Sequence, residues 1–223
     1  MRRPVRVVFV LPTLDVGGAE RVGISLLRHM PRDGFDIHLV SFSAEGRLRN
    51  EIPRDVTLVD LGQPRLLRVF PRLFRCLAEL RPDILFSTLH NANVAVLLYA
   101  RLRPQTKVVI RESNTPSASL PNLRFGKVLK WAYRLLYPRA DRIICQSEII
   151  AGQLARDFSV SAEKLVAMHN PVDIEHLRAR AGVARRDSSQ GLSFITVGRL
   201  GRQKGIDRLI EMVPRFTRSA TLL

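Results

Sequence analysis

Arg199 and Lys204 could together bind a diphosphate. Both lie in a glycine-containing segment, 198–205, which follows an apolar run at 193–197 and precedes an apolar-periodic run at 206–213. A strand, a glycine turn and a helix in this order direct backbone N–H groups and the positive end of a helix dipole at one point. A guanidinium and an ammonium group there would clamp a diphosphate; the simpler alternative is an exposed basic loop in a basic chain.

Gly17 and Gly18 form a second candidate site near the start of the chain. They separate an apolar run at 5–11 from a helical pattern at 18–30. Glycine lets the backbone approach a ligand closely, so this turn could lie against a phosphate or an acceptor, or it could be a plain strand-to-helix turn. The fingerprint Gly-x-Gly-x-x-Gly is absent, which disfavours a dinucleotide-binding protein.

Three further polar residues follow two buried strand-like runs. His90 comes after the run at 83–87, and Glu112 and Asn114 come after the run at 107–111. Ligands of open parallel sheets gather at the carboxyl ends of the strands, so we predict a catalytic role for His90 and pocket-lining roles for Glu112 and Asn114. The alternative is that all three only satisfy loop or packing contacts.

Several common reaction centres are absent from the sequence. There is no Asp-x-Asp, no His-x-x-x-His and no Gly-x-Ser-x-Gly, and the two cysteines, Cys76 and Cys145, are far apart. We therefore expect no metal site, no disulfide and no resident cofactor.

The elements that must position these residues alternate along the chain. We predict strands at 5–11, 36–42, 57–61, 83–87, 107–111, 141–146 and 165–168, with helices near 18–30, 71–80, 93–102, 123–137 and 148–158. This pattern predicts an α/β fold, a Rossmann-like parallel sheet with helices on both faces. We place a first domain at 1–183, a polar linker at 184–191 and the first strand, turn and helix of a second Rossmann-like domain at 192–223.

The chain is strongly basic, with a net charge of +16 and a pI near 11.3. Two basic amphipathic stretches, 64–81 and 123–139, could lie on an anionic membrane, or their apolar sides could simply pack on the sheet. The second stretch carries the aromatic residues Phe125, Trp131, Tyr133 and Tyr137. Our candidates for membrane contact are Arg68, Arg72, Lys127, Lys130 and Trp131. No run of residues approaches the ~20 apolar positions of a membrane span.

The order of motifs resembles the retaining glycosyltransferases of family 4. The motifs are Gly17-Gly18-Ala19-Glu20, His90-Asn91-Ala92-Asn93, Arg111-Glu112-Ser113-Asn114, Tyr137-Pro138-Arg139-Ala140-Asp141, Asn170-Pro171-Val172-Asp173 and Gly198-Arg199-Leu200 with Lys204-Gly205. The resemblance implies a GT-B architecture with an acceptor-binding first domain and a second domain that binds a nucleotide-diphosphate sugar. It implies that Arg199 and Lys204 neutralise the leaving diphosphate, that the Gly17-Gly18 turn lies near the phosphate or acceptor, and that His90 contacts the sugar or acceptor.

The sequence also departs from that family. Relatives tend to read Ser-Glu-Arg where this chain has Arg111-Glu112-Ser113, which weakens any role for Arg111. The family's later pair of donor-binding glutamates would lie beyond Leu223, so we expect a truncated donor domain and little or no transferase activity from this chain alone.

The resemblance implies that the full-length parent transfers a sugar, with retention, to a glycan or lipid-linked acceptor. We expect a cytoplasmic protein that binds peripherally to the inner face of the membrane. The alternatives are a non-catalytic acceptor-binding module, or a partner of a separate donor domain, and a GT-B-shaped sugar-nucleotide epimerase. Nucleic-acid binding is disfavoured, because no nucleic-acid-binding signature accompanies the charge.

Overall fold

The computed structural model describes residues 3–62, 66–123, 125–181, 192–198, 204–215 and 220–222. The chain divides into two compact units, 1–172 and 173–223. The sequence places this boundary later, after residue 183, because it assigns the basic helix that follows Asn170-Pro171 to the first domain. The predicted linker at 184–191 lies outside the described residues.

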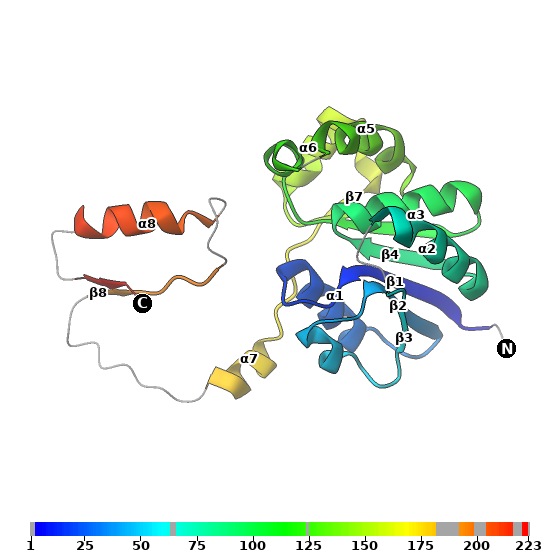
Figure 1. Cartoon of the computed structure of the whole chain (residues 1–223), viewed down its shortest axis with the longest axis horizontal. Coiled ribbons are helices and arrows are strands. Elements are labelled where there is room, and N and C mark those ends of the chain that lie inside the picture. Colours follow the sequence, from blue (N-terminus) through cyan, green and yellow to red (C-terminus); the bar gives the residue numbers. More distant parts are fainter. Residues whose placement is uncertain are drawn as a thin grey trace. The chain divides into compact units, whose positions relative to one another are not determined.

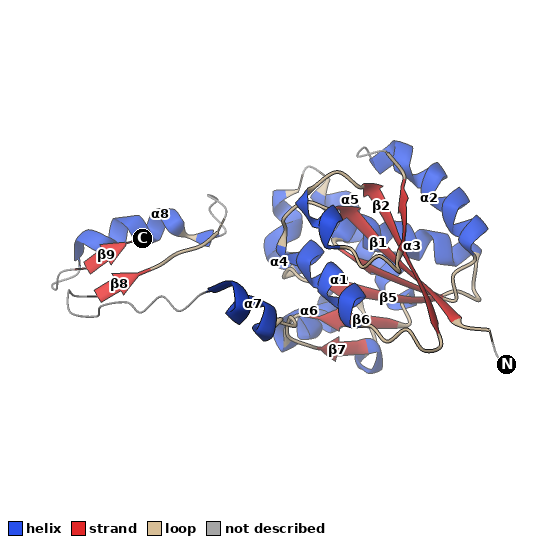
Figure 2. Ribbon diagram, turned by 90° about the horizontal axis from the view of Figure 1, so that it is seen from below, coloured by secondary structure: helices blue, strands red, loops and turns tan. Residues whose placement is uncertain are grey.

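The first unit is built on a seven-stranded sheet with the order β3-β2-β1-β4-β5-β6-β7 (Figure 2). Its strands are β1 (Val5–Thr13), β2 (Phe35–Ser43), β3 (Thr57–Asp60), β4 (Ile84–Thr88), β5 (Lys107–Glu112), β6 (Arg142–Cys145) and β7 (Leu165–Ala167). Every strand pairs with its neighbours in parallel. The predicted α/β class and parallel sheet are therefore confirmed.

Helices cover both faces of this sheet (Figure 1). The helices of the first unit are α1 (Gly18–His29), α2 (Leu66–Leu80), α3 (His90–Leu102), α4 (Pro116–Ser119), α5 (Gly126–Leu136) and α6 (Glu148–Phe158). Short 3-10 turns are η1 (Arg47–Glu51), η2 (Leu120–Asn122), η3 (Tyr137–Arg139) and η4 (Ala162–Lys164). Val7 and Phe9 of β1 pack with α1 and η1, whereas Val8 and Val10 share a core with α2, α3, α5 and α6. Alternation along each buried strand thus builds two apolar cores.

The helix α2 begins before the residue that the sequence indicates. A proline at the start of an apolar-periodic run is typical of the first helical position, and Pro71 therefore predicts a start there. The observed helix runs from Leu66 to Leu80 with Pro71 inside it. Val69, Leu73 and Leu77 are fully buried on its inner side, so packing offsets the hydrogen bond that proline removes.

The second unit contains the helix α7 (Ile174–Ala181) and a two-stranded parallel sheet. Strand β8 (Leu192–Phe194) pairs with β9 (Ala220–Leu222), and between them lie the helix α8 (Ile206–Met212) and the turn η6 (Val213–Arg215). A strand, a helix and a second parallel strand form the βαβ unit from which Rossmann-like domains are built.

Gly126 at the start of α5 has no room for a side chain. A Cβ added there would lie 1.9 Å from the carbonyl oxygen of Leu120 in η2. Alanine is ordinarily the better helix former, but this contact is with backbone and cannot rotate away. We expect Gly126→Ala to lower the free energy of unfolding by about 1.5 kcal/mol, measured by urea denaturation. Gly18→Ala, which has open space around its Cβ position, is the matched control and should show no such loss.

Candidate functional site

The candidate site lies at the carboxyl ends of the strands of the first unit. Because all seven strands are parallel, the residues that follow them meet at one edge of the sheet. Strands β1 and β4 are direct neighbours, so the Gly17-Gly18 turn and His90 follow adjacent strands.

At the end of β1, the glycine turn lies against an acidic side chain. Helix α1 begins at Gly18, and Gly17 is its N-cap. The carboxylate of Glu20 fills the space where a Gly17 side chain would lie, within 2.1 Å of the Cβ position. Thr13 donates a hydrogen bond to this carboxylate at 3.4 Å. The negative charge beside the turn favours a hydroxyl-bearing ligand there over a phosphate.

His90 follows a strained residue at the end of β4. Leu89, the N-cap of α3, has φ 73° and ψ 139°, in a region that L-residues other than glycine rarely adopt. This turn makes His90 the first residue of the helix. His90 is partly buried, and burial lowers the pKa of its imidazole below the ordinary value. At neutral pH a neutral imidazole can donate a hydrogen bond to a hydroxyl group through one ring nitrogen and accept one through the other.

Glu112, at the end of β5, points into the interior rather than into an open pocket. Tyr133 and Tyr137 donate their hydroxyl hydrogens to its Oε2 atom at 2.7 and 2.8 Å. The backbone N–H of Asn114 donates to Oε1 at 3.3 Å. Burial raises the pKa of the Glu112 carboxyl, and the two tyrosine hydrogen bonds oppose that shift.

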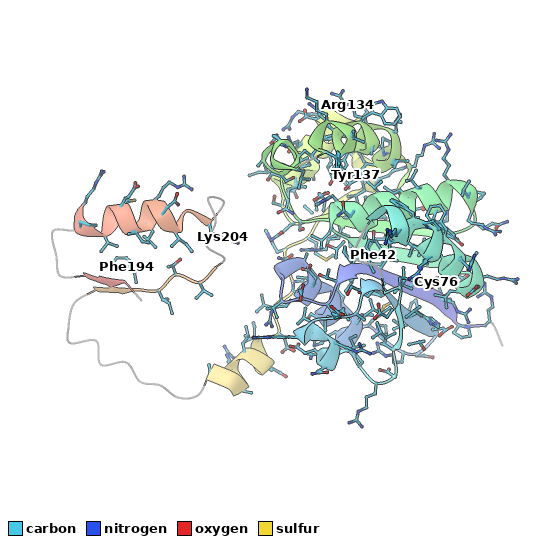
Figure 3. The ribbon with its side chains drawn as sticks, in the orientation of Figure 1. Phe42, Cys76, Arg134, Tyr137, Phe194 and Lys204 are labelled. Carbon is cyan, nitrogen blue, oxygen red and sulfur yellow. The ribbon has the colours of Figure 1, made fainter. Side chains whose placement is uncertain are left out.

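The network around Glu112 joins several elements. The rings of Tyr133 and Tyr137 stack with centroids 3.8 Å apart. Asn93 of α3 donates to the Tyr137 hydroxyl at 3.3 Å and to the Arg111 carbonyl at 3.1 Å, and it accepts from Ser87 at 2.8 Å. The ends of β4 and β5 are thereby fixed to α3, α5 and η3. In Figure 3, Tyr137 lies on the inner side of the helical layer and Arg134 on its outer side.

Arg111, whose role the sequence reasoning discounted, has buried polar contacts at the end of β5. It is buried at the end of β5, and burial lowers the pKa of its guanidinium. It donates to the Thr88 hydroxyl at 3.2 Å and also to the side-chain oxygen of Asn170. Arg111 therefore connects β4 to the segment after β7, which leads toward the second unit. Asn170 belongs to the motif Asn170-Pro171-Val172-Asp173, but nothing in the sequence pairs it with Arg111.

The predicted diphosphate loop is described only in part. Lys204 is exposed at the start of the described segment that leads into α8 (Figure 3), and a Cβ added at Gly198 would lie 3.4 Å from its Cγ. Arg199 lies outside the described residues. The predicted pairing of these two cations stays a prediction.

The candidates for membrane contact differ in their surroundings. Arg68 on α2 is exposed, whereas Arg72 donates to the Leu61 carbonyl at 2.9 Å. Lys127, Lys130 and Trp131 are all exposed on α5. Trp131 belongs to an apolar strip, here called the α5 outer face, whose exposed fractions are high: Phe125 62%, Val128 64%, Trp131 65% and Leu135 44%.

Two of the aromatic residues predicted beside these cations are not on that face. Tyr133 and Tyr137 are 1% and 0% exposed, so for these two residues the packing alternative holds. The hydroxyl groups of both bind Glu112, a partner far away in the sequence.

The described part of the chain holds neither a candidate metal cluster nor a candidate membrane span. Within it, no group of three or more His, Cys, Asp or Glu side chains could hold a metal ion. Nor does any of the helices described there combine the length and apolar character needed to cross a membrane. Cys76 and Cys145 are free thiols, and burial raises the pKa of Cys145 to about 12.

Comparisons with known proteins agree with this architecture. The chain is 28% identical over 217 residues to the N-acetylgalactosamine-N,N'-diacetylbacillosaminyl-diphospho-undecaprenol 4-alpha-N-acetylgalactosaminyltransferase of Campylobacter jejuni, covering 92% of this chain and 58% of that protein. The chain thus spans little more than half the length of this curated relative.

Solved structures share the fold at low sequence identity. Anabaena HepE in complex with UDP superposes with a TM-score of 0.65 at 19% identity, covering 98% of this chain and 60% of HepE. The UDP-GlcNAc 2-epimerase of Neisseria meningitidis, bound to UDP-GlcNAc, gives a TM-score of 0.57 at 15% identity, covering 98% and 65%. The family model for Glycosyltransferase Family 4 matches residues 16–176, which is most of the chain. With this match and the Rossmann-like parallel sheet that carries the motifs, the chain belongs to Glycosyltransferase Family 4.

Proposed function

We propose that this protein transfers a sugar from a nucleotide-diphosphate sugar to a lipid-linked acceptor, with retention of configuration. The observation that carries the proposal is the Campylobacter jejuni relative, which covers 92% of the chain and is named for transfer to a diphospho-undecaprenol-linked acceptor. The first unit then supplies the acceptor side of the reaction, and the second unit contributes to the donor side.

On the donor side, Arg199 and Lys204 neutralise the leaving diphosphate. Negative charge builds on the phosphate oxygens as the bond to the sugar breaks, so cations placed there stabilise the transition state more than the ground state. The exposure of Lys204 supports this role, because its ammonium group is available to a ligand. The donor diphosphate is a substrate, and the reaction as proposed requires no resident cofactor.

On the acceptor side, His90 and the Gly17-Gly18 turn bind the sugar that receives the transfer. The neutral ring of His90 suits hydrogen bonding to a hydroxyl group, and the nearby Glu20 carboxylate accepts from hydroxyls. Asn114 is partly buried in the loop that follows β5 at the same edge of the sheet, and we assign it to the acceptor side as well.

The protein acts at the inner face of the membrane, where it binds peripherally. The α5 outer face and its neighbours Lys127 and Lys130 support this location, because aromatic and apolar groups flanked by cations suit an anionic bilayer surface. Arg68 on α2 adds a further exposed cation.

The acceptor role is tested by sugar-dependent binding. We expect the chain to bind vesicles that contain an undecaprenyl-diphosphate-linked sugar more tightly than vesicles of the same lipids without it. His90→Ala should weaken this sugar-dependent part about tenfold, because a buried hydrogen-bonding group is lost. Vesicle flotation measures the binding. His29→Ala, an exposed histidine at the far end of α1, is the control.

Product analysis separates the proposal from its alternatives. With nucleotide sugar alone, a transferase leaves the sugar nucleotide unchanged, and with both substrates it extends the acceptor. An epimerase forms a new sugar nucleotide without any acceptor. Formation of that product by the protein isolated from its own cells would overturn the transferase proposal.

A further inference from the structure

An apolar groove of ≈ 660 Å³ lies beside the amino-terminal half of α5. Helix α4 and turn η2 form one wall, and α5 and α6 form the other. Its apolar lining comes from Pro116, Leu120, Pro121, Leu123, Val128 and Phe158. This volume falls within the range of small-molecule sites, which is roughly 300–1,000 Å³. We call it the α5 groove.

Three polar groups of the α5 groove are already paired with one another. The backbone N–H of Ser117 donates to the side-chain oxygen of Gln153 at 3.2 Å, and the amide nitrogen of Gln153 donates to Asp157 at 3.0 Å. Their hydrogen bonds are therefore satisfied without a ligand, and what remains for an occupant is apolar surface. An occupant with many hydrogen-bonding groups inside the groove would find few partners.

Two cations flank this apolar surface. Lys127 and Lys130 belong to the lining, and both are exposed. Within the part of the chain that the structure describes, neither lysine forms an ion pair, and the one acidic residue of the lining, Asp157, is bound by Gln153. The lining thus combines an apolar trough with two lysines against a single carboxylate, which leaves it net positive.

The α5 groove also continues into the α5 outer face. Phe125 and Val128 line the groove and are at the same time more than half exposed. Pro116, which also lines the groove, comes a few residues after the end of β5, the strand that carries Glu112. An apolar ligand chain could therefore extend from the surface of the bilayer along the groove toward the strand ends.

We propose that the α5 groove binds the polyprenyl chain of the lipid-linked acceptor and that Lys127 and Lys130 bind its diphosphate. This inference rests on the proposed function and assigns a site to the lipid part of its substrate. One groove with two free lysines matches a molecule with one branched apolar chain and two phosphates. A bilayer phospholipid carries two chains and one phosphate, so it matches less well.

The test compares two ligands with the same head group, geranylgeranyl diphosphate and the short dimethylallyl diphosphate. Both are titrated calorimetrically into the 223-residue chain below the concentrations at which they aggregate. We expect geranylgeranyl diphosphate to bind at least about tenfold more tightly than dimethylallyl diphosphate, because only the longer ligand fills the groove. Lys127→Ala with Lys130→Ala should weaken both ligands equally.

Substitutions in the α5 groove test whether the polyprenyl chain of the ligand binds there. Leu123→Gln should remove most of the chain-length gain, whereas Leu135→Gln, on the α5 outer face but outside the groove, should keep it. Ser117→Phe fills the groove from an exposed position, so it tests the same point if Leu123→Gln folds poorly.

Three results would overturn the inference. The wild type could bind both diphosphates equally, the gain could survive both groove variants, or dihexanoyl phosphatidylglycerol could displace geranylgeranyl diphosphate at equal concentration. In the last case a bilayer lipid occupies the groove. None of these results touches the sugar-dependent vesicle binding through His90, whose absence would instead contradict the proposed function.

Discussion

Glu112→Ala is expected to lower the free energy of unfolding by about 3 kcal/mol, among the largest losses that a single substitution in this chain should produce. Removing the carboxylate leaves the hydroxyl groups of Tyr133 and Tyr137 without their acceptor inside the core. It also leaves a cavity where the side chain was. Urea denaturation followed by circular dichroism measures the loss. Glu45→Ala, an exposed glutamate in the loop after β2, should change stability by less than about 0.5 kcal/mol.

The same carboxyl group makes stability depend on pH in a defined direction. Burial raises the pKa of Glu112 in the folded protein above its ordinary value. A raised folded-state pKa means that the folded state binds the proton more tightly than the unfolded state. The stabilisation is therefore complete below the ordinary carboxyl pKa and is lost as the pH rises through the folded-state value.

Glu112→Gln isolates this effect, because glutamine does not titrate. We expect the stability of the wild type minus that of Glu112→Gln to fall as the pH is raised from about 4 to about 8. The corresponding difference for Glu45→Gln should stay flat. If the stability of the wild type minus that of Glu112→Gln instead rises with pH, the hydrogen-bond donors around Glu112 outweigh its burial. These donors are the two tyrosine hydroxyls and the backbone N–H groups of Ser113 and Asn114.

Replacing Lys127 and Lys130 by alanine is expected to weaken binding to anionic vesicles about 30-fold. Each basic residue near such a surface contributes about 1 kcal/mol, and two together give about that factor. Because Trp131 is the single tryptophan of the chain, its fluorescence reports on α5 directly. The emission of the wild type should shift to the blue on phosphatidylglycerol vesicles at low salt and return at high salt.

The control for this experiment carries the same loss of charge elsewhere. Arg49 and Arg54 are exposed in and after η1, beside β3 at the opposite edge of the sheet from β7. Arg49→Ala with Arg54→Ala should leave vesicle binding almost unchanged. If it weakens binding as much as the α5 pair does, the net charge of the chain and not α5 drives the association.

The sheet could be predicted because buried parallel strands are recorded directly in the sequence. Val7, Val8 and Val10 are all buried, so the sequence of β1 is a continuous apolar run. The five helices predicted for the first domain correspond to α1, α2, α3, α5 and α6, because each buries one side and therefore shows a helical apolar period. Helix α4 with turn η2 was missed, because the segment 116–122 is short, contains two prolines and shows no periodicity.

The edge of the sheet where the candidate residues lie could be predicted, but the directions in which their side chains point could not. The rule that ligands gather at strand ends leads to His90 and to the Gly17-Gly18 turn. Glu112 was expected to line a pocket, yet it shares the face of β5 that carries the buried Val108 and Ile110. Counting that alternation of two along the strand would have placed Glu112 toward the helices. The partners of Arg111 could not be found this way, because Asn170 is 59 residues distant.

The backbone at Leu89 bears on how this fold could be engineered. A leucine with φ 73° costs on the order of 1–3 kcal/mol that a glycine at the same position would not. Stabilising replacements are in general easy to find, but they often cost function where a strained position supports a site. The leucine directly before His90 is such a strained position. Attempts to make the protein more heat-resistant should leave this position alone, since a gain in melting temperature here would come with a looser histidine.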